Sequence, residues 1–148
     1  MQAAISHIFL TVDDHDTALE YYVGVLGFKK TWDLPLPGGF RWLTVAPQGG
    51  EGCHLVLNKA ASEEEWALIG RQSAGDRTPL CIIQVDDFDT VYESWQTRGV
   101  SFLDSPREMP WGRMARFRDP YGNLFYLMEP NLEFVNGKVG PDEAAPGS

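Results

Sequence analysis

The sequence predicts an α+β fold made of two tandem copies of one βαβββ unit. The segment 12–17 recurs as 85–90, with five of six residues identical at an offset of 73 residues. That offset is close to half of the 148-residue chain, as a tandem duplication requires. In both copies an apolar, strand-like run precedes the repeated segment and an amphipathic stretch follows it.

The repeated segment marks the start of a helix in each copy. The apolar runs 5–12 and 80–85 are the expected first strands. An Asp-Asp pair follows each run, at 13–14 and at 86–87, and either aspartate of a pair is suited to be the N-cap. Acidic side chains at this position also interact favourably with the helix dipole.

Glycines and turns divide the remainder of each copy. Gly27 and Gly99 follow the apolar stripes of the two helices and are the expected C-terminal glycines. Three short strands should follow each helix, separated by Gly- and Pro-rich turns. Their expected positions are about 28–34, 40–46 and 53–58 in the first copy, and about 100–105, 113–118 and 124–129 in the second.

These elements predict one domain with a short tail. The tail is rich in Gly, Pro, Ala and acidic residues, so we expect it to be loose. The expected boundaries are a single domain at 1–130, with module one at 5–58, a linker at 59–79 and module two at 80–129, followed by the tail at 131–148.

Composition narrows the classes of partner. Twelve Lys and Arg against 21 Asp and Glu give a net charge of -9, which argues against nucleic acid and anionic membrane surfaces. The first residues lack a signal-peptide pattern and no apolar run is long enough to span a membrane, so we expect a cytoplasmic protein. Cys53 and Cys81 lie in apolar runs and are expected to be buried, reduced thiols.

Four segments carry a family resemblance: 17–22, 26–28, 41–45 and the Asp-Pro-Tyr-Gly-Asn turn at 119–123. Together with the tandem repeat, they make the chain resemble the vicinal oxygen chelate superfamily over about residues 5–130. This superfamily includes glyoxalase I, bleomycin resistance protein and extradiol dioxygenases. The resemblance implies a curved, half-open eight-stranded barrel that holds a ligand on its concave face. It also implies a homodimer, which would cover exposed sheet edges.

The resemblance further implies up to four metal ligands, one on the first and one on the last strand of each module. A divalent metal held there would act as a Lewis acid. His7 matches the first position, whereas its repeat counterpart is Leu80 and Tyr126 stands where metal-dependent members have Glu. The counterpart of Tyr126 in copy one is Val56 or His54, depending on the register.

Two imidazoles without a carboxylate are a poor match for Zn, Fe or Mn. We therefore expect no metal or other cofactor, and if a divalent metal binds, His7 and His54 are its ligands. His15, in the Asp-Asp turn, is expected to be exposed.

Strand alternation predicts which side chains line the ligand pocket. The pocket should be aromatic with a few polar points, which is typical of small-molecule sites. Trp111 is either a lid or an ordinary loop residue, and Phe117 aligns with Thr44 and is a further inward candidate. The expected ligand-binding residues are His7, Phe9, Thr11, Phe40, Trp42, His54, Gln84, Trp111 and Tyr126.

Three functions fit these observations. The first is a metal-free protein of the bleomycin-resistance type that binds a small, partly aromatic molecule. The second is a divalent-metal-dependent lyase, isomerase or dioxygenase of the superfamily, with a site built on His7 and His54. The third is a metal-free enzyme that uses His7 as a base or Tyr126 as an acid. The sequence contains no P-loop, GxGxxG, GxSxG or HExxH motif.

Overall fold

The computed structural model describes residues 1–49 and 52–138. The chain divides into two compact units, Met1–Gln72 with Pro120–Gly122 and Ser73–Asp119 with the residues from Asn123 onward. The first unit contains module one and most of the linker, and the second contains the end of the linker and module two. Module one has the βαβββ order and module two has the same order with one extra short strand, so the predicted α+β fold class is confirmed.

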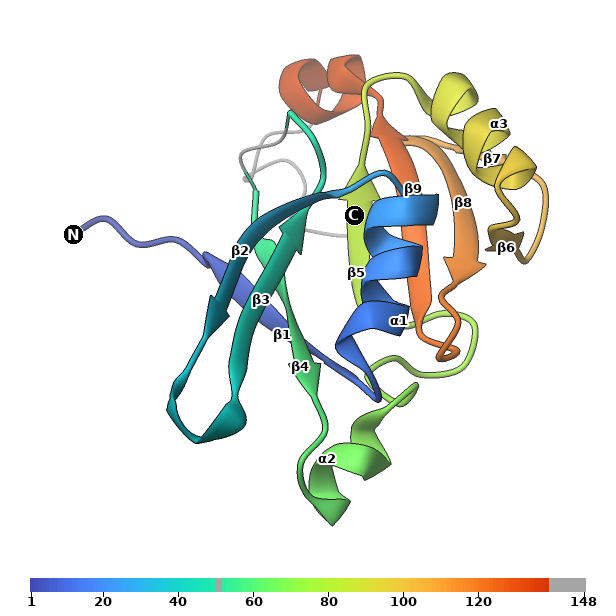
Figure 1. Cartoon of the computed structure of the whole chain (residues 1–148). Coiled ribbons are helices and arrows are strands. Elements are labelled where there is room, and N and C mark those ends of the chain that lie inside the picture. Colours follow the sequence, from blue (N-terminus) through green and yellow to red (C-terminus); the bar gives the residue numbers. More distant parts are fainter. Residues whose placement is uncertain (50–51, 139–148) are drawn as a thin grey trace. The chain divides into compact units, whose positions relative to one another are not determined.

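Module one is a four-stranded sheet with the order β1-β4-β3-β2 (Figure 1). β1 (His7–Val12) pairs in parallel with β4 (His54–Lys59). β3 (Arg41–Ala46) pairs antiparallel with β4 and with β2 (Lys29–Pro35). A 3-10 turn at Pro37–Gly39 joins β2 to β3. The bounds agree with the expected strands to within two residues.

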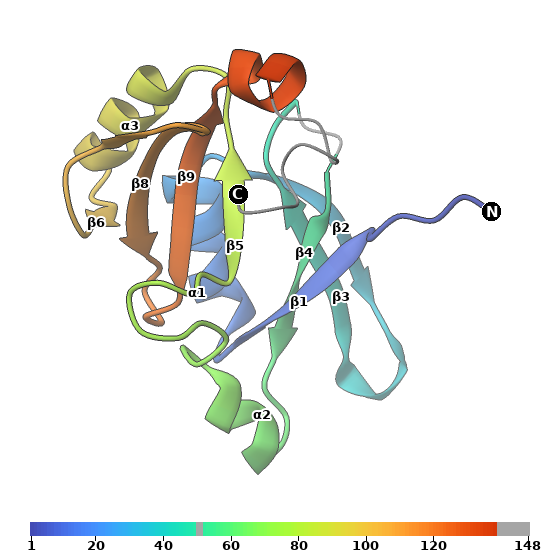
Figure 2. The ribbon, with the colours of Figure 1, turned by 180° about the vertical axis from the view of Figure 1, so that it is seen from behind.

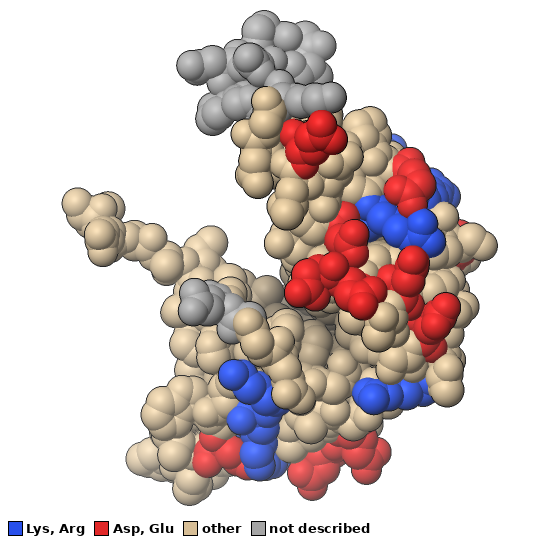
Figure 3. Space-filling view, turned by 90° about the horizontal axis from the view of Figure 1, so that it is seen from above, with Lys and Arg blue, Asp and Glu red and all other residues tan. Residues whose placement is uncertain are grey.

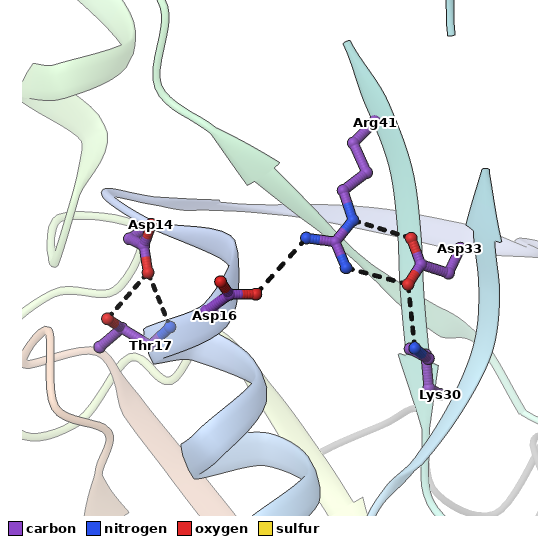
Figure 4. A network of polar contacts seen from close by, with 6 residues as sticks. All are labelled: Asp14, Asp16, Thr17, Lys30, Asp33 and Arg41. Atoms are coloured by element: carbon purple, nitrogen blue, oxygen red, sulfur yellow. Dashed lines mark hydrogen bonds and ion pairs between the residues drawn. The ribbon is translucent and has the colours of Figure 1, made fainter. Parts of the chain in front are cut away.

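The helix of module one begins at the predicted cap. Asp14 accepts a hydrogen bond from the backbone N–H of Thr17 at 2.9 Å, and the hydrogen bonds from Thr17 lower the pKa of the Asp14 carboxyl (Figure 4). α1 (His15–Leu19) continues as a π-helical turn at Glu20–Val25. Gly27 then has φ of 77°, in the left-handed region that glycine favours, and ends the helix as expected.

An ionic network fastens the β2–β3 hairpin (Figure 4). Arg41 Nε and one terminal nitrogen donate to the two oxygens of Asp33, at 2.8 and 2.9 Å. Lys30 donates to the same carboxylate at 2.9 Å, and Arg41 also lies 3.6 Å from Asp16 of α1. Hydrogen bonds from Arg41 and Lys30 hold the pKa of Asp33 far below its usual value.

Module two repeats the sheet with one difference. Its order is β5-β9-β8-β6, and β7 (Arg107–Met109) also pairs with β8 (Gly112–Arg118). β5 (Cys81–Gln84) is parallel to β9 (Leu124–Pro130), as β1 is to β4. The single strand expected at about 100–105 is instead the two-residue β6, Ser101–Phe102, with β7 following after a bend.

The helix of module two, α3 (Phe88–Thr97), is capped by Asp87 and followed by Gly99 with φ of 91°, as predicted. Trp95 packs edge-on against Phe117, with ring centroids 5.4 Å apart, and Phe117 stacks on Phe125 at 5.3 Å. The suggestion that Phe117 faces inward is therefore wrong. The register of β8 on β9 places Phe117 opposite Phe125, on the face that α3 covers.

The Asp-Pro-Tyr-Gly-Asn segment is a closed turn between β8 and β9. Asp119 and Asn123 are both buried. The backbone N–H of Asn123 donates to one carboxylate oxygen of Asp119 at 2.9 Å, and the Asn123 amide donates to the other at 3.1 Å. Asp119 N–H in turn donates to the Asn123 carbonyl at 3.0 Å. The segment thus has a structural role.

The linker and the tail each contain a short helical segment. α2 (Glu63–Leu68) is capped by Ser62. Residues 131–138 were expected to be loose, but Glu133–Lys138 forms a π-helical turn, and 139–148 lie outside the described residues. Cys53 is exposed rather than buried, because β4 begins only at His54. No helix within the described ranges has both the length and the apolar character to cross a membrane.

Candidate functional site

Four aromatic rings lie side by side on one face of the module-one sheet. They belong to His7 and Phe9 of β1, Trp42 of β3 and His54 of β4, and we call them the ring cluster. The His7 ring centroid lies 5.5 Å from Trp42 and 5.3 Å from His54, and Phe9 lies 6.1 Å from Trp42. These separations are those of interacting rings.

Strand register and alternation create the ring cluster. β1 and β4 are parallel with His7 directly opposite His54, so the two imidazoles are neighbours. Alternation places Phe9 on the same face as His7, while Leu10 points to the opposite face and is fully buried. The Phe9 side chain is 54% exposed, so the ring cluster has surface available for a ligand.

A short chain of hydroxyl groups adjoins the ring cluster. The Thr31 hydroxyl oxygen lies 2.6 Å from that of Thr44 and 2.9 Å from Nδ1 of His54. Register shifts between Lys30 and Trp32, so Thr31 is the extra residue of a β-bulge and turns toward Thr44. Sequence reasoning missed Thr31, because a bulge breaks the alternation from which faces are predicted.

The register also decides between the two counterparts of Tyr126. In module one Phe9 is opposite Val56, and in module two Ile82 is opposite Tyr126. Because the repeat offset makes Ile82 the counterpart of Phe9, Val56 is the counterpart of Tyr126. The apolar Val56 thus stands at that ligand position in module one, and His54 lies two residues earlier.

The donor set in module one does not fit a divalent metal. His7 and His54 have one ring nitrogen each near a hydroxyl group, since His7 Nδ1 lies 2.8 Å from the Ser6 Oγ atom. No group of three or more His, Cys, Asp or Glu side chains able to hold a metal occurs among residues 1–49 and 52–138. A catalytic metal in proteins needs about three protein ligands, so two imidazoles are too few.

Module two contains a cavity of about 430 Å³, which we call the module-two cavity. Its walls combine apolar and charged side chains, including Met109, Trp111, Met114, Arg107 and Tyr126. Two of the predicted ligand-binding residues, Trp111 and Tyr126, therefore line one space.

The loop 73–79 leads into β5 (Figure 2), and its residues Asp76 and Arg77 line the module-two cavity. Tyr126 donates its hydroxyl proton to the Arg77 carbonyl at 2.8 Å. Arg116 donates to the Asp76 carbonyl at 2.5 Å and to the Asp104 carboxylate at 2.6 Å. Burial opposes ionisation of Asp104, but the hydrogen bond and charge of Arg116 outweigh it and lower the pKa of Asp104. The Tyr126 hydroxyl thus has a structural partner.

The remaining predicted residues belong to neither the ring cluster nor the lining of the module-two cavity. Thr11 is buried, and its backbone N–H donates to the Gln72 side chain at 2.8 Å. Gln84 is exposed at the end of β5. Phe40 lines a separate hollow of about 280 Å³ with His15. The expectation that His15 is simply exposed is wrong, because its ring is partly buried and this burial lowers its pKa.

Charged side chains are intermixed on the surface. On the face shown in Figure 3, basic side chains lie beside acidic ones rather than forming a broad basic patch. Ion pairs of this kind, whichever face they occupy, include those of Arg113, which lies 3.1 Å from Asp89 and also contacts Glu108. This pattern agrees with the net charge of -9.

Comparison with known proteins identifies the family. The family model of the Glyoxalase/Bleomycin resistance protein/Dioxygenase superfamily matches residues 4–127. The chain belongs to this superfamily. The resemblance drawn from the repeat, the helix end and the turn is thereby confirmed for the glyoxalase/bleomycin resistance/dioxygenase superfamily.

Relatives in the superfamily cover nearly the same length. An uncharacterized protein of Shewanella frigidimarina (strain NCIMB 400) is 38% identical over 132 residues, which cover 88% of this chain and 96% of that protein. The structure of UcmS2 has a TM-score of 0.74 at 33% identity, covering 86% of this chain and 98% of UcmS2. TnmS3, an antibiotic binding protein from Streptomyces sp. CB03234, has a TM-score of 0.68 at 32% identity, covering 87% and 97%.

Proposed function

We propose that this superfamily member binds a small, partly aromatic molecule on the ring cluster of module one, without a firmly bound metal ion. The observation that carries the proposal is the ring cluster itself, in which His7, Trp42 and the half-exposed Phe9 present neighbouring ring surfaces. Stacking and burial of a flat ligand on such rings is favourable by about 1.5–3 kcal/mol per large side chain.

Three further observations support this function over the two catalytic alternatives. The described residues lack a third ligand beside His7 and His54. TnmS3, a relative at 32% identity, is an antibiotic binding protein, which is a precedent for antibiotic binding in a chain of this fold. The Tyr126 hydroxyl is engaged with Arg77, which weakens its case as a catalytic acid.

A titration with 2-ethylnaphthalene, a flat hydrocarbon, tests the proposal. We expect the probe to shift the NMR signals of His7, Phe9 and Trp42 in the wild type. Trp42→Ala should weaken binding about tenfold or more, and by more than His7→Ala does. Trp66→Ala is a matched control, because Trp66 is a half-exposed tryptophan of α2 outside the ring cluster.

The opposite pattern would overturn the proposal. If His7→Ala abolishes function while Trp42→Ala is silent, the site is an acid–base or metal centre. Elemental analysis of protein purified without chelator provides a second test. One tightly held divalent ion per chain would contradict the metal-free function and favour the metal-dependent enzyme.

A homodimer and a cytoplasmic location remain predictions. Exposed apolar side chains on the β2–β3 hairpin, including Trp32, Leu34 and Phe40, give an added reason to expect a covering partner. Light scattering at micromolar concentration should give twice the monomer mass of 16.6 kDa. A monomer under those conditions would contradict the predicted dimer.

A further inference from the structure

The hydroxyl chain beside the ring cluster has a definite starting point. Thr44 is fully buried, and its hydroxyl lies 2.6 Å from that of Thr31. Within the described part of the chain, the Thr44 side chain has no second hydrogen-bond partner. A buried hydroxyl whose proton finds no acceptor is costly, so Thr44 must donate to Thr31.

That donation sets the direction of the next bond. The Thr31 oxygen accepts from Thr44, and its own proton then points to the remaining neighbour, Nδ1 of His54, at 2.9 Å. If Nδ1 of His54 carried the proton instead, either Thr44 or the half-buried Thr31 would have a hydroxyl proton without an acceptor among the described residues. Only one arrangement uses both hydroxyl protons: Thr44 donates to Thr31, and Thr31 donates to His54.

We propose that the Thr44–Thr31 chain fixes His54 as the tautomer with its proton on Nε2, so that the ring cluster offers a directed N–H donor to the ligand. His54 is partly exposed, and within the described part of the chain its Nε2 atom has no hydrogen-bond partner, so this atom is left for a ligand. Thr31 and Thr44 are positioning residues, because they act through His54.

The Nε2–H group of His54 narrows the class of ligand, and this inference rests on the proposed function. A flat aromatic molecule stacked on the ring cluster gains most if it carries an oxygen that accepts a hydrogen bond, such as a ring-attached carbonyl. His7 offers a contrast. Its Nδ1 lies 2.8 Å from the hydroxyl of exposed Ser6, which can exchange partners with solvent, so no single tautomer is imposed on His7.

The tautomer is measurable without any ligand. Nitrogen-15 NMR in alkaline buffer, where imidazoles carry one N–H, should give the shifts of an Nε2–H ring for His54, with Nδ1 accepting a hydrogen bond. In Thr44→Val, the Thr31 hydroxyl oxygen no longer receives a hydrogen bond from Thr44 and can accept one from Nδ1 of His54. The fraction of His54 rings with the proton on Nδ1 should therefore rise. Thr31→Val should remove the hydrogen-bond shift of Nδ1.

Thr11→Val is the matched control for repacking, because Thr11 is another buried threonine of the same sheet and lacks a bond to His54. Its His54 shifts should equal those of the wild type. A wild-type ring with the proton on Nδ1 would overturn the inference. So would unchanged His54 shifts in a folded Thr44→Val variant.

The ligand class is tested with a matched pair of probes, 2-acetylnaphthalene and 2-ethylnaphthalene, which differ by one carbonyl group. His54→Phe retains a ring but cannot donate. We expect it to weaken binding of the ketone about fivefold and to change binding of the hydrocarbon by less than twofold.

Equal effects on both probes would overturn the assignment of an oxygen-bearing ligand. If neither probe shifts the signals of the ring cluster, the proposed function fails and the ligand class fails with it. The tautomer of His54 is then still decided by the NMR experiment alone, so the two failures can be distinguished.

Discussion

Where module one carries His7 and His54 on its paired first and last strands, module two carries Leu80 and Leu124. The correspondence follows from the register, since Ile8 pairs with Leu55 as Cys81 pairs with Phe125. The two modules also differ in what adjoins their faces. The ring cluster of module one presents exposed rings, whereas the loop 73–79 is bonded to Arg116 and Tyr126 in module two.

The difference shows which positions of a duplicated unit are free to diverge. Side chains on the helix-packed face are apolar in both copies, for example Leu10 in β1 and Ile83 in β5. They make up each module's core, where volume and polarity are constrained. The opposite face includes half-exposed side chains such as Phe9 and Ile82, so it can carry rings, imidazoles or hydrogen bonds to a loop.

The largest expected effect concerns the turn between β8 and β9 of module two. Asn123→Ala removes the amide that hydrogen-bonds to buried Asp119, so we expect a loss of about 2–3 kcal/mol in the free energy of unfolding. Urea denaturation measures it. Asn136→Ala, at an exposed asparagine, should change stability by less than about 0.5 kcal/mol. A similarly small loss for Asn123→Ala would show that the turn is not a structural anchor.

A comparison of two tryptophans tests which module binds the ligand. Trp42→Ala should weaken binding of 2-ethylnaphthalene about tenfold or more, because it removes a central ring of the ring cluster. Trp111→Ala, in the module-two cavity, should change it by less than about twofold. Isothermal titration calorimetry measures both. A larger effect of Trp111→Ala would move the binding site to module two.

The loop 73–79 provides the third test. Tyr126→Phe deletes the hydrogen bond to the Arg77 carbonyl and should cost about 1 kcal/mol in stability. Trypsin should then cleave faster after Arg77, which mass spectrometry detects. Tyr92→Phe is the control, since among the described residues the Tyr92 hydroxyl accepts a hydrogen bond from the exposed Gln96 of the same helix. Equal cleavage rates in both variants would mean that Tyr126 does not hold the loop.

The smallest expected effect is the pH dependence of the ionic network in module one. The folded-state pKa of Asp33 is lowered by Arg41 and Lys30, so its stabilisation is present above the unfolded pKa of about 3.9. This stabilisation is lost as the pH falls through the lower pKa that Asp33 has in the folded protein. Asp33→Asn should therefore be less stable than the wild type at neutral pH, and urea midpoints should converge below about pH 3.9. A constant difference would exclude this linkage.

The sequence by itself determined the repeated architecture. The repeat at 12–17 and 85–90, the caps Asp14 and Asp87 and the glycines Gly27 and Gly99 all occupy the expected places. These features depend on neighbours within a few residues, such as the capping hydrogen bond that the Thr17 N–H donates to Asp14. Period-two alternation was equally local, and it correctly put His7, Phe9, Trp42 and His54 on one face.

Only the tertiary structure decided which residues of neighbouring strands and loops lie opposite each other. The pairing of Phe9 with Val56 fixed the counterpart of Tyr126, and the bulge at Thr31 brought a hydroxyl to His54. Phe117 faces α3, and Tyr126 binds the Arg77 carbonyl, 49 residues away in the sequence. Register, bulges and loop contacts join distant residues, and their energies depend on pairings that no local pattern of residue types encodes.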